Sequence, residues 1–212
     1  MKGSLAITSY CSISVNKVLL DGRLLFENQS DNFSEFASGF YRYSGISYPK
    51  FHKMDNLCKL GSLSAEALLK DKDLIHKYAG DEIGIILMNS SSSLDTDRNH
   101  QKTISNRADY FPSPAVFVYT LPNVVIGEIC IRHKIFGEGN FFVTEKFDPS
   151  FIFSYVSHLF DNDYVKCCIS GWVEISANNF ESVLFLIEKT GKTETGIANF
   201  EPAAMESIYN SK

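Results

Sequence analysis

The sequence of 212 residues lacks several features that would assign it to a functional class at once. It has no dense cluster of Lys and Arg. Its formal net charge of −5 and its pI of ≈ 5.5 argue against bulk attraction to nucleic acid or anionic lipid. No apolar run approaches the roughly 20 residues that a membrane-spanning helix needs. We therefore expect neither a nucleic-acid partner nor a membrane span.

Cysteine is scarce, and its count of five is odd. An odd count predicts no disulfide framework, so a reducing cytoplasm is the expected location. Cys167 and Cys168 are neighbours on a presumed strand. They therefore point to opposite faces and cannot bind one metal ion together. We interpret both as small core residues, and we interpret Cys11, Cys58 and Cys130 in the same way.

Motifs for cofactors and metals are missing too. The sequence has no P-loop, dinucleotide fingerprint, zinc spacing or nucleophile elbow, so no cofactor is expected. Asp95 and Asp97 have no Glu or His at ligand spacing, which favours a helix start over a metal site. Residues 90–93 are all Ser. They indicate the turn after a strand, with a pocket wall as the alternative. His133 and His158 are interpreted as cations near helix C-termini.

The remaining residues alternate between strand and helix patterns, which predicts an α/β fold. We expect one domain over residues 1–212, with a mostly parallel or mixed five-stranded sheet and helices on both faces. Residues 28–52 are read as an irregular insertion and 191–212 as a polar tail with one short helix near 202–209. Strands are predicted at 4–9, 83–88, 141–143, 164–171 and 182–189, with a hairpin at 18–26. Helices are predicted at 54–70, 74–79, 94–105, 121–137 and 148–160.

Residues 140–150, NFFVTEKFDPS, form the junction between a predicted strand and a helix. Asp148 suits the N-cap of that helix, and Pro149 suits its first position. Such a junction holds the nucleophile in many enzymes. Here it holds no group of that kind.

The stretch at 112–137, PSPAVFVYTLPNVVIGEICIRHKIFG, resembles the β-ketoacyl synthases of the thiolase-like superfamily. Those proteins carry an Asn-x-x-x-Gly-x-Ile-x-Ile helix that ends in a Gly turn. The matching residues are Asn123, Gly127, Ile129, Ile131 and Gly137. The resemblance covers roughly residues 4–190, but only the N-terminal half of the family's fold. In the family the second half contributes two active-site histidines, and we expect no counterpart of it here.

The resemblance also locates the missing nucleophile. In the family this junction carries a Cys whose pKa is lowered by the helix dipole, beside N–H groups that stabilise an oxyanion. That Cys position falls at Phe147, or at Lys146 if the register slips by one. Neither side chain accepts an acyl group. Asp148 as a cap would occupy the N–H groups, so the resemblance implies an inactive condensing site.

The resemblance thus predicts a non-catalytic ketosynthase-like accessory subunit of fatty-acid or polyketide/aryl-polyene-type biosynthesis. The expected partner is a ketosynthase or a second copy of this chain, with an acyl carrier protein as a further partner. In the family the strand matching 141–144 pairs with its mate across a dimer. The alternative is a split or divergent condensing enzyme of the 3-oxoacyl-[acyl-carrier-protein] synthase type that needs a second chain. A stand-alone acyl-binding or regulatory module is the third hypothesis.

A half-fold has an apolar face that must be covered. We expect its cover to be the segment 28–52, the tail, a second copy or another protein.

Overall fold

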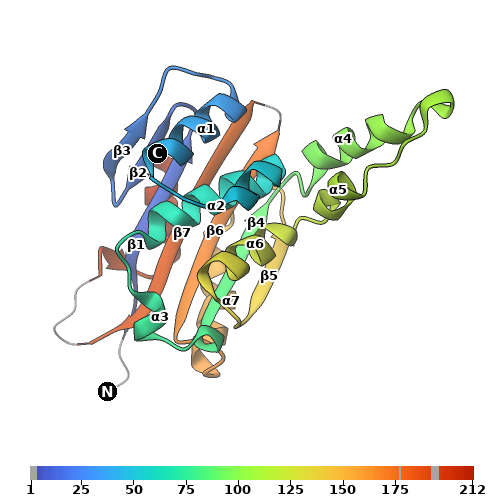
Figure 1. Ribbon diagram of the computed structural model, residues 1–212. Coiled ribbons are helices and arrows are strands. Elements are labelled where there is room, and N and C mark those ends of the chain that lie inside the picture. The colour runs from blue at the N-terminus through green and yellow to red at the C-terminus, as the bar shows by residue number, and fades with distance from the viewer. Residues whose placement is uncertain (1–3, 177, 192–195) are drawn as a thin grey trace.

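A computed structural model describes residues 4–176, 178–191 and 196–212. Its centre is an eight-stranded sheet in the order β3-β2-β1-β7-β6-β4-β5, with β8 paired to β1 (Figure 1). The strands are β1 (Ser4–Ser14), β2 (Lys17–Leu20), β3 (Arg23–Glu27), β4 (Ile83–Asn89), β5 (Gly139–Val143), β6 (Cys167–Ser176), β7 (Asn179–Thr190) and β8 (Ala198–Asn199).

The sheet is mixed, as expected. β4 pairs in parallel with both β5 and β6, and the other pairs among the described strands are antiparallel. The predicted number of five strands is wrong. Five strands form the middle and one edge of the sheet, from β1 through β7, β6 and β4 to β5, and β2, β3 and β8 extend it at β1. β4 is buried along its whole length, which explains its unbroken apolar run.

The hairpin expected at 18–26 is confirmed as β2 and β3. Asp21 and Gly22 connect these strands with φ values of 53° and 78°. Positive φ at both central residues is the backbone of a type I′ turn, whose twist matches that of paired strands. The Asp-Gly pair supplies the two residues that adopt this conformation most readily.

Helices cover both faces of the sheet. They are α1 (Phe33–Tyr43), α2 (Asn56–Leu69), α3 (Leu74–Lys77), α4 (Leu94–Ile104), α5 (Pro114–Phe117), α6 (Val124–His133), α7 (Pro149–Asp161) and α8 (Pro202–Asn210), joined by the 3-10 turns η1 (Pro49–Lys53), η2 (Gly80–Glu82), η3 (Arg107–Asp109) and η4 (Val118–Thr120). One core lies between the sheet and helices α1, α2 and α6, and the other lies under α7 and α8.

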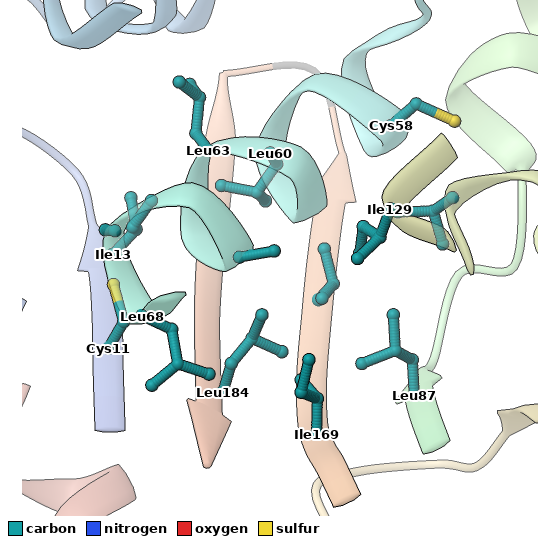
Figure 2. Packing of buried hydrophobic residues seen from close by; sticks show 14 of the residues in the cluster. Cys11, Ile13, Cys58, Leu60, Leu63, Leu68, Leu87, Ile129, Ile169 and Leu184 are labelled. Atoms are coloured by element: carbon teal, nitrogen blue, oxygen red, sulfur yellow. The ribbon is translucent and has the colours of Figure 1, made fainter. Parts of the chain in front are cut away.

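Figure 2 shows α2 lying across the sheet, with Leu60 and Leu68 directed at residues such as Leu184 on the strands below. A close contact with α6 holds α2 in this place. A Cβ atom on Gly61 would lie 2.3 Å from a methyl group of Val125. Glycine at this position therefore lets the two helices pack together.

The segment 28–52 is not irregular, which corrects the sequence-based expectation. It contains α1, whose buried residues Phe33, Phe36, Ala37 and Phe40 follow the spacing of one helical face. Phe33 and Phe36 each lie with ring centroids 5.0 Å from that of Phe180 on β7. The segment thus closes the end of one core.

The tail closes the other core. Its predicted helix is confirmed as α8, while residues 192–195 lie outside the described part of the chain. Met205 on α8 is fully buried, and Phe200 just before it is buried as well. Both belong to the core under α7. The chain therefore covers both faces of its sheet with its own segments.

The segment between β4 and α6 leaves the body as an arm, which we define as residues 94–121. Figure 1 shows α4 and α5 projecting beyond the β5 side of the sheet. The predicted helix at 94–105 is confirmed as α4. Within the described residues no single helix has both the length and the apolar character needed to cross a bilayer. The pair Pro114–Thr120 and Val124–His133, bent by 98°, meets that test only when both helices are counted together.

Candidate functional site

The junction between β5 and α7 has the geometry that the sequence predicts. The Asp148 carboxylate accepts a hydrogen bond of 2.9 Å from the backbone N–H of Phe151, and Pro149 begins the helix. Thr144 at the end of the strand donates its hydroxyl to the Lys146 carbonyl at 2.9 Å. The Phe151 N–H group in the first turn of α7 is thus satisfied by the protein itself and is not free to bind an oxyanion.

Phe147 points into the core. Its side chain is only 8% exposed and belongs to the cluster under α7 and α8. Its ring stacks on Tyr209 of α8, with centroids 4.5 Å apart and planes at 20°. Trp172 on β6 and Phe185 on β7 lie at 6.4 and 6.3 Å. A side chain at position 147 therefore faces packed aromatic rings rather than an open pocket.

A carboxylate on β7 fixes α8 over this position. Glu181 accepts hydrogen bonds from the Tyr209 hydroxyl at 2.7 Å, the Trp172 indole at 3.0 Å and the Lys212 ammonium at 2.5 Å. Burial raises the pKa of Glu181, but the bonds from Lys212, Tyr209 and Trp172 outweigh it, so the pKa lies below its usual value. We call Phe147, Trp172, Glu181 and Tyr209 the sealed junction.

The sequence singled out Phe147 as a candidate position but gave no sign of the other three members of the sealed junction. They lie between 25 and 62 positions further along the chain, on three different elements. The available signal was that the single Trp of the chain, Trp172, needs a polar partner when buried.

The five cysteines are free thiols. Cys167 lies in one core and Cys168 in the other, which confirms that they point to opposite faces. Burial raises the pKa of all five thiols, above all those of Cys11, Cys58, Cys167 and Cys168. A raised pKa keeps a thiol protonated and unreactive at neutral pH. Cys11, Cys58, Cys167 and Cys168 are buried core residues, and Cys130 is partly buried against one core.

His133 is not the helix-terminal cation that the sequence suggested. Its imidazole is mostly buried, and burial lowers its pKa despite Glu66, whose carboxylate is 3.8 Å away. Glu66 instead binds the Arg132 guanidinium at 2.5 Å. The charge near this helix end is therefore that of Arg132. His158 is exposed in the last turn of α7, where its ring lies 3.2 Å from the Asn162 amide.

Asp95 and Asp97 lie in the first turn of α4, but neither is its N-cap, which is Ser93. Asp95 accepts from the Asn56 amide at 2.9 Å, and Asp97 accepts from the Ser93 hydroxyl. The residues that the structure describes contain no group of three or more possible metal ligands.

The Ser run at 90–93 forms a turn. Its Ser90 and Ser91 N–H groups donate to the Glu174 carboxylate at 2.7 and 3.2 Å. The turn reading is therefore confirmed.

The five residues that carry the family resemblance divide into two groups. Ile129 is fully buried against α2, and Gly137 is required because a Cβ atom there would lie 2.4 Å from the Ile83 carbonyl oxygen. Asn123 and Ile131 are exposed, and a Cβ atom on Gly127 would meet nothing within 4 Å. The face of α6 that holds these three residues is therefore not packed against the core.

No protein-family model and no curated protein matches the sequence, but solved structures do. The ishigamide ketosynthase/chain length factor matches with a TM-score of 0.64 at 19% identity, over 91% of this chain and 64% of that chain. The AntDE:AntF complex of a type II polyketide acyl-carrier protein with its ketosynthase matches with a TM-score of 0.64 at 11% identity, over 88% and 62%.

A third match covers nearly the whole of both chains. The complex of the ketosynthase ApeO with its chain length factor ApeC from Xenorhabdus doucetiae has a TM-score of 0.57 at 12% identity, over 98% of this chain and 90% of that chain. Matches at these identities establish the fold. This chain spans less than two thirds of the first two structures. The chain therefore has one half of the ketosynthase-like, thiolase-type fold.

Proposed function

We propose that the chain is a non-catalytic, ketosynthase-like accessory subunit of fatty-acid or polyketide-type biosynthesis, and that its main partner is a ketosynthase. The chain would be stable alone, because its own segments cover its cores, and it would join the synthase without forming a covalent acyl intermediate. An acyl carrier protein, which the AntDE:AntF structure holds together with its ketosynthase, is the second partner that we propose for the assembled complex.

The observation that carries this proposal is the sealed junction. Phe147 stands where the family places its nucleophile, and it is buried under α8. Its neighbour Asp148 caps α7. A ketosynthase-like half that retains its fold around such a junction is suited to binding rather than condensation.

The split-enzyme alternative has less support. It needs a reactive thiol or another nucleophile on this chain, whereas burial raises the pKa of every cysteine thiol. An acyl-binding module has little support as well. The enclosed cavities around His133 have volumes of ≈ 110 and ≈ 100 Å³, against roughly 300 Å³ or more for ordinary ligand pockets. Two wider grooves are open to solvent: one beside α1 is lined by Asn, Ser and charged residues, and one of ≈ 550 Å³ beside the β2–β3 hairpin has a partly apolar lining.

Co-expression with the ketosynthase encoded nearest to its gene tests the proposal. The affinity-tagged chain is purified and passed over a size-exclusion column with light-scattering detection. We expect a complex that contains both polypeptides in a 1:1 ratio. A chain that elutes as a monomer, with the ketosynthase in a separate peak, would contradict the proposal.

A further inference from the structure

We infer that α8 is a latch over the sealed junction. The helix opens as one unit while the sheet and α7 stay folded, and the contact between Lys212 and Glu181 holds it closed. The latch controls whether position 147 is covered, and it does not depend on which partner the chain binds.

Two glutamates face each other beneath the end of α8. Glu174 on β6 and Glu181 on β7 are direct partners in the antiparallel register, so their side chains lie on the same face of the sheet. Like charges in this arrangement repel each other. The pair therefore needs a compensating positive charge.

Glu174 is fixed by the Ser turn. One of its carboxylate oxygens accepts hydrogen bonds from the Ser90 N–H at 2.7 Å, the Ser90 hydroxyl at 2.6 Å and the Ser91 N–H at 3.2 Å. The other oxygen is buried and has no hydrogen-bond partner among the described residues. Because three donors hold one oxygen, Glu174 cannot turn away from Glu181 without losing these bonds.

Lys212 supplies the positive charge. Among the described residues it is the only cation that forms an ion pair with either glutamate, at 2.5 Å from Glu181. Its side chain is 13% exposed, so salt and water screen this charge only in part. The Lys212 ammonium also lies 3.3 Å from the centre of the Tyr209 ring, which stacks on Phe147. The charge contact therefore acts on the part of α8 that closes the junction.

The rest of α8 is held by few contacts. The helix has nine residues, fewer than an isolated helix needs to be stable in water. Its N-cap Glu201 makes no capping bond through its side chain. Met205 is the one buried residue of this helix, all of which the structure describes, and Ile208 and Tyr209 are partly buried. Elements with few buried contacts open at a lower free energy than the whole fold.

The chain just before α8 is anchored, which places the hinge. β8 pairs with β1, and the Phe200 N–H donates to the Leu5 carbonyl at 3.1 Å. Phe200 is buried, and its ring centroid lies 5.4 Å from that of Phe153 on α7. Glu201 follows in an extended conformation, and Pro202 begins the helix. α8 can therefore turn about Glu201 while β8 stays on the sheet.

Opening of α8 uncovers position 147. In the closed state Phe147 is buried, with the Tyr209 ring stacked on it. The N-cap of α7 comes from Asp148, which needs no contact with α8. Opening therefore exposes Phe147 and the Trp172 indole while α7 keeps its first turn.

Hydrogen exchange under native conditions tests the latch. The free chain is labelled in D2O at urea concentrations below its unfolding transition, and the exchange is followed by mass spectrometry of its peptides. We expect the amides of 202–210 to exchange through an opening that depends only weakly on urea. The slowest amides of β6 and β7 should exchange through global unfolding, with the full urea dependence. An equal free energy of opening and an equal urea dependence for α8 and β7 would overturn the inference.

Removal of the Lys212 charge tests what holds the latch closed. Lys212→Met keeps the aliphatic part of the side chain and removes the ammonium. We expect exchange at 202–210 to become about tenfold faster, the effect of losing one hydrogen bond to a charged group. The matched control is Lys189→Met, because Lys189 contacts Asp163 and Phe160 at the other end of β7. The control should change this exchange by less than about twofold. Exchange in Lys212→Met as slow as in the wild type would contradict the role of the charge.

A thiol at position 147 gives a second measurement. In Phe147→Cys the rate of reaction with a thiol reagent reports the uncovering of this position, and Lys212→Met alone measures the background from the native cysteines. Addition of Lys212→Met to Phe147→Cys should raise this rate by the same factor as the exchange of α8. If the exchange becomes faster and the thiol rate stays the same, α8 opens without uncovering position 147, and the latch is not its cover.

Discussion

At the scale of single residues, two neighbours at the start of α7 have opposite environments. The Asp148 carboxylate satisfies the helix N-terminus, whereas Phe147 fills the core below it. A helix N-terminus favours a thiolate only if the thiol lies beside it and has access to substrate. In this chain the Asp148 carboxylate is the anion beside the helix N-terminus, and the Phe147 ring fills the space next to it.

The cap can be tested directly. Asp148→Ala should lower the free energy of unfolding by about 1 kcal/mol, the usual contribution of an N-cap. Asp148→Asn keeps an oxygen acceptor and should retain most of the stability. Urea denaturation of both variants measures the difference. Equal stability of Asp148→Ala and the wild type would show that this side chain does not cap α7.

Restoring a cysteine should not restore reactivity. Phe147→Cys places a thiol at the position that the family resemblance assigns to the nucleophile, but under Tyr209 and beside the Asp148 carboxylate. We expect no acyl adduct from an acyl thioester and slow reaction with a thiol reagent. The smaller side chain should also lower the free energy of unfolding by about 2–4 kcal/mol, slightly less than is usual for Phe→Ala.

The double variant Phe147→Cys/Tyr209→Ala removes the stacked ring, and its thiol should react faster. Tyr209→Ala alone measures the background from the native cysteines. Rapid acylation of the single Phe147→Cys variant would mean that the position is open to substrate, contrary to the sealed junction.

At the scale of secondary-structure elements, α8 connects stability to pH through Glu181. Hydrogen bonds hold the pKa of this carboxylate below its usual value. Such a group stabilises the folded state fully above its unfolded pKa, about 4.3 for Glu, and this stabilisation is lost as the pH falls through the folded pKa. Protonation of Glu181 removes its negative charge. That charge attracts Lys212 and strengthens the hydrogen bond from Tyr209.

Glu181→Gln should therefore be less stable than the wild type by about 1.5–3 kcal/mol at pH 7, since hydrogen bonds to a charged group have this size. The difference should begin to shrink as the pH falls below the usual Glu pKa of about 4.3, and it should vanish below the lower pKa of the folded state, where the wild-type carboxylate is neutral as well. Glu188, whose pKa is lowered too, is present in both proteins, so its contribution cancels. Urea denaturation from pH 7 to pH 3 measures the difference. A difference that stayed constant over this whole range would contradict this role of the charge.

Elements with strong local signals were predictable from sequence. The Asp21-Gly22 turn, the apolar run of β4 and the Asp148-Pro149 helix start all follow from local chemistry. Helix α1 was missed because Asn, Ser and Gly surround its four buried residues and hide their spacing. The sequence did not show that one side of α6 is exposed, because an apolar residue on a helix does not reveal whether the core or a partner covers it.

The candidate site was predictable only in part. The motif alignment gave the position of Phe147, because strand, turn and helix follow each other locally. It could not give Tyr209 and Glu181, which meet Phe147 through tertiary packing over long sequence separations. The lowered pKa of His133 could not be predicted for the same reason, because it results from burial in the folded structure.

At the scale of the whole molecule, the chain covers the two faces of its sheet with its own segments. α1 closes one core and α8 closes the other. Among the described residues, the arm with its exposed apolar side chains projects on the side of the sheet that ends at β5 (Figure 1). Covered cores and an edge strand at one side of the sheet are consistent with the accessory-subunit role that we propose.

The central claim is that this chain joins a ketosynthase without being acylated itself, and intact-mass spectrometry of the purified complex tests it most directly. The complex is incubated with an acyl-loaded acyl carrier protein, quenched with acid, and the mass of each polypeptide is measured. We predict an acyl adduct on the ketosynthase and an unchanged mass for this chain. An acyl adduct on this chain, at any residue, would contradict the account.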